Sequence, residues 1–238
     1  NCRLGSTENT EIGAVENSLG NTRLTTLTYE GQPLSSQAKC IGAYEDGGEE
    51  TMYWFINDPA NTNSSTGKVD MIVSYNTKLD LIFYHVISTS VLNFDDTYLV
   101  TGVNLIDGLL FFTDNLNPPR KININRTYQY PISDVDQVTE QDIGVIVAPP
   151  LFAPTLTPVQ QGGGENYMTD IMISFAYRYK YEDNEYSAIS PFSPISFSPG
   201  PFQLDFSTYD NIGMENVYNS VIVKFNTGGR NVKGVDLL

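Results

Sequence analysis

The sequence predicts an all-β protein, and three observations support this fold class. Apolar side chains recur at every second position in several segments, as they do along a strand with one buried face. The 19 glycines and 13 prolines separate these segments at short intervals. Apolar residues make up 40% of the 238-residue chain and charged residues only 17%, a balance that excludes a disordered chain. The chain lacks a run of about 18 apolar residues, so no membrane-spanning helix is predicted.

The first half of the chain predicts two groups of antiparallel strands. Residues 1–37 read as short extended pieces joined by turns, because their apolar positions have no helical period. Four strands in succession match one propeller blade in size. Asn, Asp, Gly and Pro occupy the connections between them, where their backbone preferences favour turns. The four predicted strands are Lys39–Tyr44, Thr51–Ile56, Lys68–Tyr75 and Leu79–Val86.

Two details of this first group are predicted from its side-chain pattern. In the third strand Val69, Met71 and Val73 alternate with polar residues, so one face is expected to be buried. The fourth strand, from Leu79 to Val86, is apolar on both faces and is therefore expected to be the more central one.

A second group of strands follows, and it is expected to form most of another blade. The predicted strands are Thr97–Val103, Gly108–Thr113 and Arg120–Asn125, with a turn at Ile106-Asp107-Gly108. Propellers need about four to eight blades to close a ring. Residues 1–130 are therefore interpreted as propeller-like blades of an incomplete unit.

The segment 131–166 differs from the residues before it. It contains five prolines and the triple glycine 162–164. Proline favours extended backbone, whereas glycine allows flexible joints. Residues 131–166 are thus predicted to be a Pro/Gly-rich acidic linker that crosses between two modules and packs on a neighbour.

The region 167–238 predicts an immunoglobulin- or fibronectin III-like β-sandwich, either complete or incomplete. Alternate residues from Ile171 to Tyr181 are apolar or aromatic, a turn follows at 182–185, and Tyr186–Ile189 is the expected return strand. Pro191, Pro194, Pro199 and Pro201 limit further pairing, as edge strands require. Residues 202–206 and 219–238 are expected to supply further strands.

The charge of the chain restricts its partners. There are 13 Lys and Arg against 28 Asp and Glu, which gives a net charge of −15. A specific nucleic-acid binder needs a basic face to displace counterions from phosphates, and an anionic membrane surface attracts basic segments. Both partners are disfavoured.

Residues with catalytic or metal-binding chemistry are few. The one histidine, His85, lies on the apolar face of a predicted strand and is interpreted as a buried, hydrogen-bonded core residue. No Gly-x-Ser-x-Gly segment positions a nucleophilic serine, and one His with two Cys does not provide the usual zinc ligands. No enzyme activity, catalytic residue, cofactor or metal site is predicted. Cys2 and Cys40 are interpreted as free thiols of a reducing compartment, although pairing between them stays open.

Three stretches carry a resemblance to a known family. They are NCRLGSTENTEIGAVENSLGNT (1–22), VTGVNLIDGLLFFTDNLNPPRKININR (100–126), and YRYKYEDNEYSAISPFS (177–193) together with NSVIVKFNTGGRNVKGVDLL (219–238). In this order they resemble the muzzle or tail stabilisation proteins of crAss-like and related short-tailed bacteriophages. The resemblance covers roughly a third of the chain.

This resemblance implies a structural virion protein at the distal end of a short tail. It implies assembly in the host cytoplasm, contacts with other tail proteins, a ring of copies, and a part in gating the exit of DNA or cargo. It also implies a longer polypeptide of which this chain is a piece, and we expect the strand-rich ends of the chain to continue in it.

The acids of the linker are predicted to act in that setting. Residues 131–170 hold six acids and no Lys or Arg. They are expected to face either the lumen through which DNA passes, where acidic walls repel phosphates, or a basic patch on a neighbour; a plain solvated surface is the third interpretation. The candidate interface or lumen acids are Asp134, Asp136, Glu140 and Asp142.

A second function class stays open at this point. The aromatic content, with Trp54 and 15 tyrosines, suits a cell-surface carbohydrate-binding or glycan-degrading β protein in which aromatic rings stack on sugars. Aromatic side chains at strand period are more typical of core and cross-strand pairs. No pair of carboxylates stands out as catalytic among 28 acids.

Overall fold

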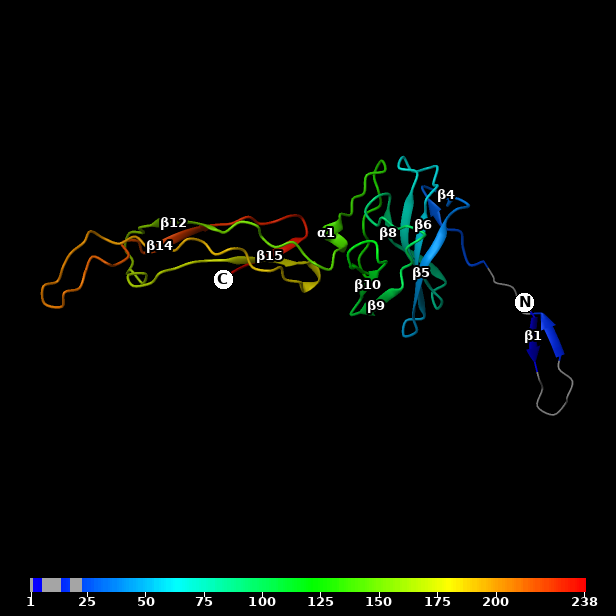
Figure 1. Ribbon diagram of the computed structural model, residues 1–238, viewed down its shortest axis with the longest axis horizontal. Coiled ribbons are helices and arrows are strands. Elements are labelled where there is room, and N and C mark those ends of the chain that lie inside the picture. The colour runs from blue at the N-terminus through cyan, green and yellow to red at the C-terminus, as the bar shows by residue number, and fades with distance from the viewer. Residues whose placement is uncertain (1, 6–13, 18–22) are drawn as a thin grey trace.

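The computed structural model describes residues 2–5, 14–17 and 23–238, and it describes the first two ranges through their backbone alone. The described residues form a β-rich lobe from which a long arm extends (Figure 1). The all-β prediction is confirmed, because the described helices are one turn of α-helix and one 3₁₀ turn. None of these helices is long and apolar enough to span a membrane.

The lobe is built on a four-stranded antiparallel meander that the sequence predicted well. Its strands pair in the order β5-β6-β7-β8; short turns connect β5 to β6 and β7 to β8, and the longer loop 59–68 connects β6 to β7. The hairpin that follows, β9–β10, turns through Asp107 and Gly108, both at positive φ, as a two-residue type I′ turn requires. The strands of the lobe are β3 (Thr28–Tyr29), β4 (Gln32–Pro33), β5 (Lys39–Asp46), β6 (Thr51–Asp58), β7 (Val69–Asn76), β8 (Leu81–Ser88), β9 (Gly102–Ile106), β10 (Leu109–Thr113) and β11 (Arg120–Asn123).

Two apolar clusters cover the two faces of this meander. One lies between it and the three-stranded sheet β9–β11, where the rings of Phe55, Phe94 and Phe112 meet edge to face or tilted at 5.1–6.2 Å between centroids. The other places Tyr29 of β3 against Val69, Met71 and other residues of the opposite face. The core of the molecule therefore lies in the lobe.

Two of the expectations for these strands were wrong. Strand β7 is buried on both faces rather than one, because its polar residues Asp70 and Ser74 are hydrogen-bonded inside the first cluster. Strand β8 is the edge of the sheet rather than its centre, and Leu81 and Phe83 are exposed on it. An apolar strand need not be central, because folded proteins also expose part of their apolar side chains.

The stretch predicted as a linker, residues 131–166, is divided between the lobe and the arm. Val138 and the helix α1 (Glu140–Ile143) belong to the lobe, where Val138 and Ile143 are buried in the first cluster. The strand β12 (Thr155–Val159) belongs to the arm, where it pairs with β14 (Ser220–Lys224). Proline content alone did not indicate a structureless connector, because strand edges and tight turns also accept proline.

The arm contains two separate two-stranded sheets. Besides β12–β14, the strand β13 (Tyr177–Tyr181) pairs with β15 (Val232–Leu237), and the 3₁₀ turn η1 (Glu182–Asn184) follows β13. The hairpin of β1 (Cys2–Gly5) and β2 (Ala14–Asn17) lies on the other side of the lobe (Figure 1). None of the described sheets closes on itself.

Candidate functional site: the joint and the arm

The arm is fastened to the lobe by ion pairs that converge on η1. Arg126, just after β11, pairs with Glu182 and lies 2.8 Å from the carboxylate of Asp183. The amide of Asn123 donates to the same Asp183 carboxylate at 2.6 Å. Asp183 is at positive φ, the conformation that turns the chain and presents its side chain to the lobe. The lobe thus holds the turn that follows β13.

A second set of contacts between the arm and the lobe involves Asp142 of α1. Asp142 accepts hydrogen bonds from the backbone and hydroxyl of Thr139 at 2.6 and 2.8 Å, and the backbone bond belongs to the capping box of this short helix. Arg230 lies 2.8 Å from Asp142, and Asn231 donates to it as well. Burial opposes ionisation of this carboxyl, but these hydrogen bonds outweigh it and lower the pKa of Asp142.

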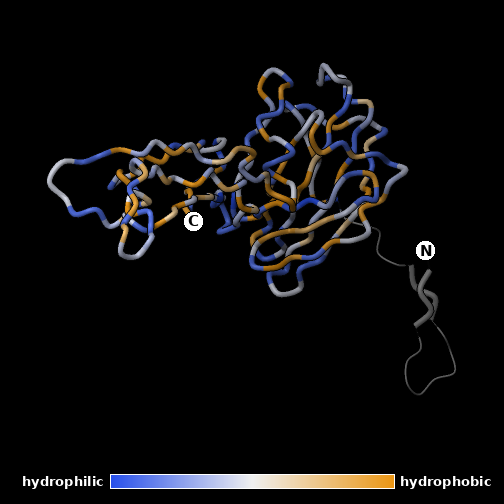
Figure 2. The backbone as a smooth tube through the Cα atoms, turned by 60° about the vertical axis from the view of Figure 1, so that its left-hand side comes forward, coloured by the Kyte–Doolittle hydropathy of each residue, from blue (hydrophilic) through white to orange (hydrophobic). Residues whose placement is uncertain are grey.

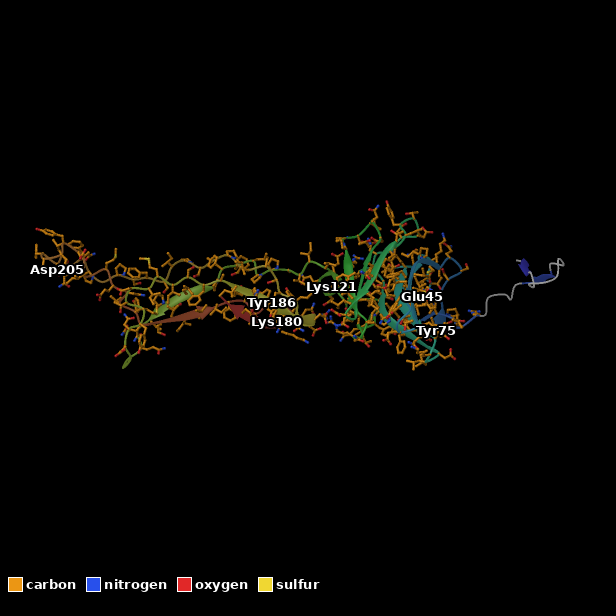
Figure 3. All side chains as sticks on the ribbon, turned by 90° about the horizontal axis from the view of Figure 1, so that it is seen from below. Glu45, Tyr75, Lys121, Lys180, Tyr186 and Asp205 are labelled. Carbon is orange, nitrogen blue, oxygen red and sulfur yellow. The ribbon has the colours of Figure 1, made fainter. Side chains whose placement is uncertain are left out.

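A third contact is largely removed from water. Lys121 of β11 is buried and pairs with Glu185, which follows η1. The hydroxyl of Tyr181 donates to the backbone carbonyl of Ala148 at 2.7 Å and adds a further contact at the joint. The cavity among these residues is only about 20 Å³, which is room for about one water molecule rather than a ligand. We therefore interpret the joint as a mechanical connection (Figure 3).

The four acids singled out by the sequence do not form one site. Asp134 accepts from the hydroxyl of Tyr29 at 2.8 Å and from the backbone of Ser65 at 2.9 Å. Asp136 organises the turn after β8, and Asp142 lies in the joint. Glu140 has an 80% exposed side chain, 3.8 Å from Arg120. Three of the four acids are thus tied into the fold, and whether any of them faces a lumen or a partner stays a prediction.

The other residues singled out by the sequence have structural positions. His85 is buried and its Nε2 lies 2.8 Å from the hydroxyl of Ser74, as predicted for a core histidine, and burial lowers its pKa. Trp54 packs against the second apolar cluster. Cys40 is exposed, and Cys2 lies where only the backbone is described. Within the described side chains no three His, Cys, Asp or Glu are placed to hold a metal ion.

The sequence reasoning missed the main feature of the arm, which is how few of its apolar side chains are buried. Of the arm residues only Met168, Ala176, Tyr177 and Tyr179 belong to the buried apolar set. Large apolar side chains lie along its outside instead, and Figure 2 shows hydrophobic stretches along the arm as well as in the lobe. The most exposed of the aromatic ones are Phe152, Tyr167, Phe192, Phe202, Phe206 and Tyr209. Exposed apolar surface on this scale is typical of an interaction surface.

We expect Arg126→Ala to lower the free energy of unfolding by about 1–2 kcal/mol, because the variant leaves Asp183 without its cation and Glu182 with the exposed Lys233 alone, in a half-buried joint. Urea denaturation followed by tyrosine fluorescence measures this loss. Lys39→Ala is the matched control, since it removes a solvent-exposed ion pair with Asp96 that is worth less than about 0.5 kcal/mol. Equal losses for both variants would contradict a fastening role for Arg126.

Comparisons with known proteins identify no relative: no family model, no curated protein and no solved structure matches this chain.

Proposed function

We propose that this chain is a structural, non-catalytic part of a virion, a component of the distal end of a short bacteriophage tail. The observation that carries the proposal is the arm, whose large apolar side chains lie outside and whose own core is small. A protein of this kind gains stability by assembly, because contacts with neighbours bury what the isolated chain leaves exposed. The resemblance of residues 1–22, 100–126, 177–193 and 219–238 to tail muzzle proteins gives that assembly its setting.

The architecture is compatible with the finer parts of this proposal. Four antiparallel strands in sequence order, packed face to face on a following sheet, are what two neighbouring propeller blades look like. In the arm, β13 and β15 would be strands of an immunoglobulin-like sandwich completed by residues outside this chain.

In the tail, copies of the chain would form a ring with other tail proteins around the path of the DNA. The net charge of −15 supports a role in which the wall does not retain DNA, because nonspecific affinity comes from cations that neutralise phosphates. Among the four acids predicted for such a wall, Glu140 has the exposed side chain and would be the one to face a lumen.

Purified virions test the proposal. We expect mass spectrometry to find peptides of this chain in them, and gold-labelled antibodies against the arm to mark the tail end away from the capsid. Labelling of the capsid shell, or absence of these peptides from intact virions that contain the other tail proteins, would overturn it. Labelling of a bacterial cell surface would favour the carbohydrate-binding alternative.

A further inference from the structure

Residues 186–196 run back along β13 and the residues before it. Every third residue from 187 to 196 is a serine, and these serines pair with every second residue of 173–179. Ser187, Ser190, Ser193 and Ser196 donate their N–H groups to the carbonyls of Tyr179, Tyr177, Phe175 and Ile173, at 2.7–3.0 Å. The first three serine hydroxyls accept from the N–H groups of Tyr179, Tyr177 and Phe175, each at 3.0 Å. Each hydroxyl also donates to the carbonyl of the next residue. The hydroxyl of each of these three serines therefore has its hydrogen-bond partners within the arm.

The other two residues of each repeat lie outside. Ile189, Phe192 and Ile195 occupy the third positions and are 49%, 63% and 59% exposed. Ala188, Pro191 and Pro194 occupy the second positions and are exposed too. Because three residues here match two residues of the facing strand, equivalent side chains recur roughly every 7 Å along the arm. We call the exposed positions of 187–195 the apolar ribbon.

Two properties of the apolar ribbon restrict what binds it. Pro191 and Pro194 have no N–H, so the ribbon cannot extend a regular ladder to an added strand, and its partner has to engage side chains. From Tyr186 to Leu204 there is no charged residue, in a chain of net charge −15. This is a surface on which a second copy can approach without the repulsion that its other surfaces impose.

We propose that the arms of two copies pack on each other through their apolar ribbons, antiparallel and around a two-fold axis at Phe192. Two identical ribbons have the same repeat, so in this arrangement Ile189 of one copy faces Ile195 of the other. The inference rests on the proposed role of the arm in assembly and names its partner as this same chain. A ring built from such pairs needs a second, different interface between them, because a two-fold contact by itself closes as a dimer.

Charge selects the antiparallel direction. The tip of the arm, residues 199–217, holds Asp205, Asp210 and Glu215 and no Lys or Arg. A parallel pair would bring two acidic tips together. Figure 3 places Asp205 at the far end of the arm and Tyr186 with Lys180 near the joint. An antiparallel pair keeps the two acidic tips apart and directs each towards the joint end of the other copy. There Arg178, which is paired with Asp236, and Lys180 lie against Tyr186 and offset the acids of η1.

Sedimentation of the full chain tests the contact. We expect a concentration-dependent dimer. Phe192→Asp is expected to raise its dissociation constant at least 100-fold, since two like charges then meet at the axis. The matched control is Leu79→Asp, which is expected to leave the dimer unchanged because Leu79 is 60% exposed in the turn before β8, outside the arm. Circular dichroism verifies that both variants are folded. A monomer at every concentration, or oligomers that Phe192→Asp does not affect, would overturn the proposal.

Cysteine cross-linking tests the direction in a chain that carries Cys2→Ser and Cys40→Ser. Mild oxidation is expected to link Phe192→Cys to itself and to link Ile189→Cys to Ile195→Cys in a mixture of the two variants. Self-linking of Ile189→Cys without the mixed product would overturn the antiparallel pair. Both readouts use purified chain, so their failure would leave the virion experiment, and with it the proposed function, to be judged separately.

Discussion

Replacing Asp136 by alanine is expected to lower the free energy of unfolding by about 3 kcal/mol. Its carboxylate accepts the backbone N–H groups of Thr89, Ser90 and Val91 at 2.8–2.9 Å and the hydroxyls of Ser88 and Ser90 at 2.8 Å. Removal of the carboxylate leaves the N–H group of Thr89 and the hydroxyls of Ser88 and Ser90 without this acceptor, whereas the N–H groups of Ser90 and Val91 keep the Ser88 hydroxyl. Each lost charge-assisted hydrogen bond costs about 1 kcal/mol or more. Chemical denaturation of the full chain measures the effect.

Asp134 provides the matched control for this variant. It is the same residue type two positions earlier, and it accepts two hydrogen bonds at a more exposed place. Asp134→Ala is therefore expected to give a clearly smaller loss than Asp136→Ala. If the two variants were equally destabilised, the network around Asp136 would not be the reason. Charge reversal at Asp136 disturbs the fold for the same reason, so a test of a DNA-lining role is better made at Glu140.

The strands of the lobe could be predicted because their signals are local. In the meander β5–β8, turn residues and side-chain alternation both come from within a few residues, and the observed strands begin and end within two residues of the predicted ones. The position of β8 at the edge could not be predicted in this way. It depends on which residues outside the strand cover its faces, and the sequence of the strand itself does not contain this information.

The arm could be predicted only in part, because its pairing follows a repeat that the usual patterns do not contain. The alternation from Ile171 to Tyr181 and the turn at 182–185 pointed to a hairpin, and β13 with the return segment forms one. Pro191 and Pro194 predict that further pairing is limited, and they give no sign that the segment which contains them is itself paired. In the structure the serine hydroxyls replace backbone donors and acceptors, so pairing continues past the prolines.

The acids of 131–142 illustrate a different limit. A run of acids without bases looks the same in the sequence whether it coats a surface or accepts hydrogen bonds. Burial opposes ionisation of Asp136, but the N–H and hydroxyl groups of residues 88–91 outweigh it and lower its pKa. The partners lie more than 40 residues away in the sequence, and only the fold brings them together.

Asp70 is expected to make the protein less stable as the pH rises from 5 to 7. Its side chain is fully buried on β7, where it accepts from the amide of Asn57 at 2.8 Å and from the backbone of Phe94 at 2.9 Å. Lys68 lies 3.3 Å away, and the buried Arg120 also favours the charged form of the carboxyl. Burial outweighs these contacts and raises the pKa of Asp70 from 3.8 to about 6.

The sign of the effect follows from proton binding. Between pH 3.8 and 6 the folded state holds a proton on Asp70 that the unfolded state has released, so stability falls as the pH rises through this window. The full difference is about 3 kcal/mol, of which roughly 1.3 kcal/mol falls between pH 5 and 7. His85 acts in the opposite direction, because burial lowers its pKa and the unfolded state takes up the proton first.

The comparison with Asp70→Asn isolates the contribution of this one carboxyl, since His85 and the carboxylates of lowered pKa are present in both proteins. Free energies of unfolding are measured by urea denaturation at pH 5, 6 and 7. The stability of the wild type relative to the variant is expected to decline by roughly 1.3 kcal/mol across this range, because only the wild type loses a proton from this site. A difference that is constant with pH would mean that Asp70 is already ionised at pH 5. In that case Lys68, Asn57 and Phe94 would compensate the burial of its charge, and the first apolar cluster would contain a permanent ion pair.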